Sequence, residues 1–160
     1  MKPFWILILL FAIFVFGSSS CSKEKTDSQK ITLKITYLNS IGKCYKFTDT
    51  NRGYVINDST SFQIIGDSAK VAWPTLCDSS KLPGIDFSKY TVLGKLTINS
   101  ACDTITREVL SDSLNKKYIY NINIQEPQGR CIYIAIPNMN WVLVPKLPRE
   151  YKVEFIITID

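Results

Sequence analysis

The stretch "YKVEFIITI" (Tyr151–Ile159) carries the pattern that decides the fold of this chain. Bulky side chains stand at every second position, from Tyr151 through Phe155 to Ile159, and Lys152 and Glu154 stand between them. In a β-strand the side chains alternate between two opposite faces, so a pattern that repeats every two residues indicates a strand. A helical pattern repeats about every 3.6 residues. The stretch therefore predicts a strand with one buried face.

The same signature recurs along most of the chain. Runs rich in β-branched and aromatic residues predict further strands at 31–38, 44–48, 54–56, 90–98, 104–110, 117–124 and 131–136. Polar, turn-forming segments separate many of these runs, and Gly94 in the middle of one run suggests a bulge or a bend. We therefore expect a mainly β domain, either an antiparallel sandwich or a partly open barrel, with at most one or two short helices.

A helix has one plausible position. Asp58 or Ser59 could cap a short turn whose apolar side is formed by Phe62 and Ile65. Several of the residues around them are indifferent or poor helix formers, so the turn is expected to be short. The following segment, 66–83, is expected to be an irregular loop.

The N-terminus has the three parts of an export signal: Lys2, an apolar run at 4–16 and then small residues. The run is too short for a permanent span, because its thirteen residues extend only ~20 Å as a helix against a hydrocarbon core of ~30 Å. Cys21 directly follows "SSS", which resembles the lipobox of bacterial lipoproteins, although Ser18 stands where a large apolar residue is commoner. The alternatives are an uncleaved anchor or plain secretion with an unused thiol.

This pattern divides the chain into three parts. Residues 1–20 are expected to form a lipoprotein signal peptide, residues 21–30 a lipidated Cys21 with a flexible tether, and residues 31–160 a single β-rich domain. The expected location is the outer membrane, on the periplasmic or the cell-surface side, with the membrane bound through the N-terminal lipid. The net charge of +5 is spread along the chain, with no basic run longer than Lys116–Lys117, and so gives no reason to expect nucleic-acid binding.

The remaining cysteines are even in number, and an exported domain enters an oxidising compartment. The four candidates for disulfide bonds are Cys44, Cys77, Cys102 and Cys131. Three pairings are possible, and we favour Cys102–Cys131 with Cys44–Cys77, because each closes a loop of about thirty residues between neighbouring strands. A zinc site is the weaker alternative, since the chain has no Cys-x-x-Cys pair and no histidine.

The absence of histidine also removes the commonest general base and every Ser-His or Cys-His pair. Asp86, Asp103 and Glu108 could serve a hydrolase only if two of them converged in a cleft. The local context favours a structural role for Asp86, which precedes a predicted strand and could bond to nearby backbone N–H groups. We therefore expect no enzyme, no catalytic residue, no metal and no cofactor.

Aromatic residues offer one candidate ligand surface. Tyr118 and Tyr120 share one face of their predicted strand, above Ile122 and Ile124. Such a strip can stack against sugar rings, but it is more often one side of a core. The polar residues that alternate with these tyrosines favour the core.

Two stretches, "LPGIDFSKYTVLG" (82–94) and "NWVLVPKLP" (140–148), resemble a group of small uncharacterised lipoproteins of Bacteroidota. In that group a cysteine follows the first stretch and another precedes the second, as Cys102 and Cys131 do here. "DFSKYTVLG" and "VPK" show a fainter similarity to the C-terminal domain of a subunit of a spirochaete surface protease complex. The resemblance covers roughly residues 54–157 and implies a β-rich domain of exported proteins, without assigning an activity.

Together these observations predict a lipid-anchored, exported β-domain without enzymatic activity, which binds or scaffolds another protein at the cell envelope. The alternative is a surface lipoprotein that binds glycans or small ligands on an aromatic strand face. The ligand-binding residues themselves stay unknown at this level.

Overall fold

The computed structural model describes residues 30–41, 51–72, 77, 82–131 and 134–160. In chain order the strands are β1 (Lys30–Thr32), β2 (Thr36–Tyr37), β3 (Gly53–Ile56), β4 (Tyr90–Ser100), β5 (Thr104–Asp112), β6 (Lys117–Gln125), β7 (Ala135–Pro145) and β8 (Lys152–Ile159). A 3₁₀ turn spans Asn39–Ile41, and one α-helix, α1, spans Ser59–Ala72. The predicted strand at 44–48 lies outside the described residues.

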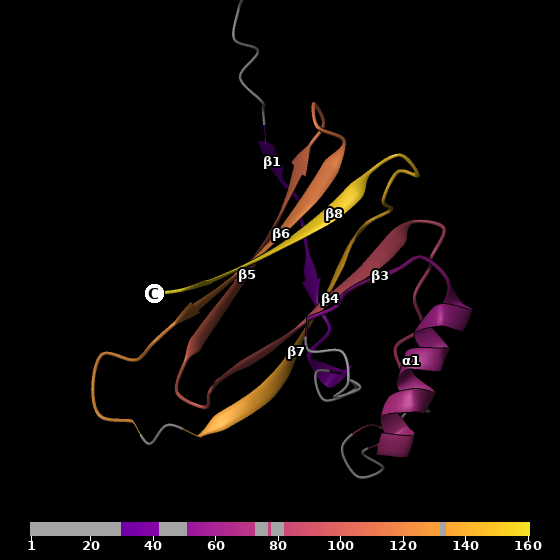
Figure 1. Cartoon of the computed structure of the whole chain (residues 1–160). Coiled ribbons are helices and arrows are strands. Elements are labelled where there is room, and N and C mark those ends of the chain that lie inside the picture. Colours follow the sequence, from indigo (N-terminus) through magenta and orange to yellow (C-terminus); the bar gives the residue numbers. More distant parts are fainter. Residues whose placement is uncertain (1–29, 42–50, 73–76, 78–81, 132–133) are drawn as a thin grey trace, which may run out of the picture.

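The strands form two sheets packed face to face, which confirms the predicted mainly β sandwich (Figure 1). One sheet has the order β1-β5-β6-β8 and the other β2-β7-β4-β3. The segment that holds β1 and β2 serves both sheets: Ile31 lies opposite Ser111 in the first, and Tyr37 lies opposite Val142 in the second. One pairing differs from the antiparallel prediction, because β8 runs parallel to β6.

The sheet that contains β4 and β7 is buried on both faces, which gives the domain three layers. Alternate residues of these strands face the other sheet, where Leu93 and Val142 are fully buried. The residues between them, such as Val92 and Trp141, face α1. Such a two-sided burial explains why "TVLG" and "WVLV" contain so few polar residues.

The helix is longer than the sequence predicts, because residues Gly66–Ala72 are helical and not part of an irregular loop. The backbone N–H of Ser61 donates to Asp58 Oδ1 at 2.7 Å, so Asp58 is the predicted N-cap. Phe62 and Ala69 are buried against the sheet. Tertiary packing of this one face outweighs the weak helix propensity of the segment.

Strand β7 begins and ends later than predicted, at Ala135–Pro145 in place of 131–136. The strand signal fades at Pro137, which cannot donate a ladder hydrogen bond. Lys146 N–H donates a hydrogen bond to the Lys89 carbonyl. Together with the register, this bond shows that the backbone N–H and C=O groups of the even-numbered residues of β7 point toward β4. The backbone groups of Pro137 and Pro145 therefore face away from β4, so the strand continues through Pro137 and includes Pro145 as its last residue.

Of the bulge or bend predicted at Gly94, the bulge is wrong, since β4 pairs with β7 without interruption from Tyr90 to Ser100. A Cβ atom at Gly94 would overlap the ring of Trp141. Trp141 is 3% exposed and packs against Tyr54 at 5.5 Å between ring centroids. Glycine is required here because an indole ring occupies the position of its missing side chain.

Candidate functional site

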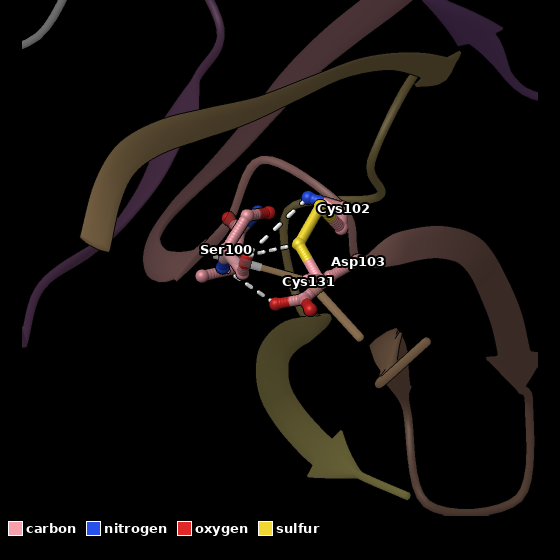
Figure 2. The surroundings of a disulfide bond; sticks show 5 residues. Ser100, Cys102, Asp103 and Cys131 are labelled. Atoms are coloured by element: carbon pink, nitrogen blue, oxygen red, sulfur yellow. Dashed lines mark hydrogen bonds between the residues drawn. A yellow bond between two sulfur atoms is a disulfide. The ribbon is translucent and has the colours of Figure 1, made fainter. Parts of the chain in front are cut away.

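The Cys102–Cys131 disulfide is formed, with 6.5 Å between the two Cα atoms. It joins the turn between β4 and β5 to the segment between β6 and β7 (Figure 2). Ser100 and Asp103 surround it: the Ser100 N–H donates to Asp103 Oδ2 at 2.6 Å, and the Ser100 hydroxyl lies 3.8 Å from Cys131 Sγ. Through these contacts, the four residues help to connect the two sheets.

Removing this bridge with Cys102→Ala and Cys131→Ala together should lower the free energy of unfolding by roughly 3 kcal/mol, because a loop of this length is no longer closed in the unfolded chain. Chemical denaturation at matched pH measures the change. Ser113→Ala, in an exposed turn at the other end of β5, is the control and should change little. Equal denaturation midpoints for the double variant and the natural chain would contradict the prediction.

The other cysteine predictions fall largely outside the described residues. Cys77 is disulfide-bonded and only 1% exposed, with its Sγ 3.6 Å from the Gly66 carbonyl oxygen. The predicted partner Cys44 and the predicted lipidation site Cys21 are not among the described residues, so both assignments stay predictions. Across the described ranges, no group of three or more histidine, cysteine or acidic side chains could hold a metal ion.

The three candidate acids do not converge. Asp86 precedes β4 and Asp103 follows it, so roughly 30 Å of strand separates them. Glu108 is exposed on β5 and accepts a hydrogen bond from the Thr32 hydroxyl at 3.0 Å. Asp86 and Asp103 are therefore too far apart to act together as a carboxylate pair.

Asp86 has the structural role that its position before a strand predicts. Its side chain accepts hydrogen bonds from the hydroxyl and the backbone N–H of Ser88 and pairs with Lys89 at 3.0 Å. The Ser88 side-chain bond is the largest cause that lowers the pKa of Asp86 to about 2, followed by the bond from Lys89. The carboxyl is therefore ionised at neutral pH, and its hydrogen bonds stabilise the turn there.

The tyrosines of β6 belong to the core. Tyr118 is 6% exposed and packs edge-on against Tyr151. Tyr120 is fully buried between the sheets and packs against Phe155 in a tilted arrangement. Burial raises the pKa of Tyr120 well above its usual value. Neither ring can stack on a sugar, so the glycan alternative loses the residues on which it was based.

A groove that the sequence analysis did not predict lies between β3 and α1. Its volume is about 350 Å³. One wall is the strand segment 52–56, and the other is formed by Ser61, Ile64, Ile65 and Ser68. The four helix residues are spaced as i, i+3, i+4 and i+7, which places them on one face of α1. A sequence signal existed in this spacing, but the short predicted helix did not extend far enough to show it.

Two properties distinguish this groove from a packing defect. First, β3 is the last strand of its sheet, and no strand among the described residues pairs with its outer edge. Second, an apolar side chain of α1 stays exposed along it, since Ile64 is 58% accessible. An open strand edge beside an apolar helix face can hold an extended peptide as an additional strand.

The fold and this groove define a β-sandwich domain in which a groove lies beside the last strand of one sheet. Comparisons with protein-family models, curated proteins and solved structures gave no match for the chain. Within the described ranges, no helix has both the length and the apolar character needed to cross a membrane.

Proposed function

We propose that this protein is an exported, lipid-anchored β-sandwich without enzymatic activity, which binds another protein at the cell envelope. The groove between β3 and α1 is the observation that carries the proposal, because it offers both backbone hydrogen-bonding groups and an exposed apolar side chain. The pattern around Cys21 supports export and anchoring at the outer membrane. The resemblance to lipoproteins of Bacteroidota supports export and lipid anchoring in the same way.

A pull-down of the tagged full chain from membranes, after mild crosslinking in cells, tests the binding function. We expect one or a few envelope proteins to be recovered in proportion to the bait. An unrelated lipoprotein with the same tag and a similar expression level is the control. Recovery of the bait alone, or of the same proteins with the control bait, would overturn the proposed function.

The anchor makes a separate prediction. Cys21→Ser should move most of the protein from the membrane fraction to the soluble fraction, because the thiol that carries the lipid is lost and each buried CH₂ group of an acyl chain contributes about 0.8 kcal/mol to membrane binding. Ser22→Ala, which keeps the thiol, should stay on membranes. Undiminished membrane retention of the Cys21→Ser variant would instead support an uncleaved anchor.

A further inference from the structure

The hydrogen-bonding direction of β3 follows from its neighbours. Lys146 N–H donates to the Lys89 carbonyl at 2.8 Å, which makes this pair hydrogen-bonded in the β4–β7 ladder. Because successive residues of a strand direct their backbone groups to opposite sides, the odd-numbered residues of β4 face β7 and the even-numbered ones face β3. Leu38 N–H, which donates to the Trp141 carbonyl at 3.1 Å on the other side of β7, fits the same alternation.

This alternation fixes which residues of β3 face outward. Tyr54 lies opposite Gly94 and Ile56 opposite Val92, so their backbone groups point toward β4. The N–H and C=O groups of Gly53 and Val55 therefore point away from the sheet, along the outer edge of β3. Within the described part of the chain, no backbone hydrogen bond to Val55 at this edge is found.

The edge is held in place at both ends by lysine side chains. Lys95 Nζ donates to the Asn51 carbonyl at 2.7 Å, and Lys146 Nζ donates to the Asn57 carbonyl at 3.0 Å. The Thr91 hydroxyl adds a bond to Asn57 Oδ1 at 2.6 Å. These contacts fasten both ends of β3 (Gly53–Ile56) to the neighbouring part of its sheet, so a partner strand would meet a preformed edge.

Charge and side-chain direction define what fits there. Among the described residues that line the groove, Arg52 is the only charged one. It is exposed, and its guanidinium group lies 5.8 Å from the centre of the Tyr54 ring. A strand added antiparallel to β3 has its C-terminal end beside Arg52. Its residues opposite Tyr54 and Ile56 point toward the α1 side, where Ile64 is exposed.

We propose that the groove binds an extended segment of another protein as a strand antiparallel to β3. The segment carries apolar side chains at two alternate positions facing Ile64, and a carboxylate at its C-terminal side facing Arg52. Backbone bonds with Gly53 and Val55 provide the pairing, and the apolar and acidic positions provide the selectivity. The proposal rests on the proposed protein-binding function and specifies how the partner is bound.

The most direct test is Val55→Pro, because the lost N–H points outward and does not belong to the β3–β4 ladder. Val55→Thr, which keeps the N–H and a β-branched side chain, is the matched control. The probe is a displayed pool of random heptapeptides, selected on the purified full chain and counter-selected on the Val55→Pro variant. Unchanged circular dichroism and thermal midpoint show that each variant is folded.

We expect peptides with alternate apolar residues and an acidic residue toward the C-terminus. The selected peptides should bind Val55→Pro about tenfold more weakly or worse, since a backbone bond and the close approach of the strand are lost. Binding to Val55→Thr should stay within about twofold. Arg52→Glu, which lies just outside β3, should weaken the acidic peptides about tenfold by reversing a charge-assisted contact.

Other outcomes would overturn the proposal. If no peptide is enriched over the Val55→Pro variant, or if N-methylation of alternate peptide bonds leaves binding unchanged, strand addition at β3 is wrong. An acidic residue selected at the N-terminal side would overturn the antiparallel orientation. If a partner recovered by pull-down in cells is retained equally by Val55→Pro, this binding mode fails while the protein-binding function stands; if the natural chain recovers no partner, the function itself fails.

Discussion

Gly94→Ala should lower the free energy of unfolding by about 3 kcal/mol, at the upper end of the usual cost of overpacking a core. The added methyl group would overlap two ring carbons of Trp141 and would lie 2.8 Å from Cε of Met139. Both side chains are nearly inaccessible to solvent, at 3% and 2% exposure. The indole ring cannot move away easily, because Tyr54 packs against it.

Chemical denaturation of Gly94→Ala and Gly84→Ala separates overpacking from a general effect of losing a glycine. A Cβ atom at Gly84 meets nothing within 4 Å, so Gly84→Ala should change the free energy of unfolding by no more than about 0.5 kcal/mol. In a Trp141→Leu background, where the ring is absent, Gly94→Ala should cost much less than in the natural chain. A full cost that persists in that background would show that the strain does not come from the ring, and would assign it to Met139 or to the backbone.

The alternation of apolar and polar residues was sufficient to predict most strands. "YKVEFIITI" is β8 within one residue, and the strands predicted at 90–98, 104–110 and 117–124 are β4, β5 and β6 with slightly later ends. The Cys102–Cys131 pairing was also predicted correctly. These features depend on local periodicity or on loop length, which a single sequence displays directly.

The features that the sequence did not reveal depend on contacts between distant segments. The parallel pairing of β8 with β6 and the requirement for glycine at position 94 are set by neighbours from other strands. The length of α1 is set by the sheet on which Phe62 and Ala69 pack. The groove also depends on contacts between distant segments, because it needs both the full helix and the position of β3 at the end of its sheet.

A buried polar cluster between the sheets is another feature of this kind. Asn140 on β7 is 1% exposed, although it lies on the same face as Val142 and Val144. Its Oδ1 accepts from Arg107 Nε at 2.8 Å, and its Nδ2 donates to the Thr97 hydroxyl at 2.9 Å and to the Lys95 carbonyl at 3.1 Å. The amide therefore bridges β4, β5 and β7, and the polar letters "NMN" in a strand have a structural explanation.

Asn140→Leu should lower the free energy of unfolding by about 3 kcal/mol, because it leaves the Arg107 Nε–H, the Thr97 hydroxyl and the Lys95 carbonyl without this partner between the sheets. Tyr120 keeps its bond to the backbone carbonyl of residue 140, at 3.0 Å in the natural chain, so the loss is confined to the side chain. Denaturation at neutral pH measures the effect. Asn138→Leu, at a less buried position of the same strand, is the control and should cost less.

A second substitution decides whether the loss comes from the unpaired groups. With Arg107→Leu added to Asn140→Leu, the charged donor is removed along with its acceptor, and the double variant should regain part of the stability lost by Asn140→Leu alone. Such a recovery would mean that the bridge mainly specifies the register between the sheets and adds little net stability. If the losses of stability of Arg107→Leu and Asn140→Leu simply add up in the double variant, this interpretation is contradicted. Most of the cost of Asn140→Leu would then come from its bonds with β4, because Thr97 and Lys95 lose their partner with and without Arg107.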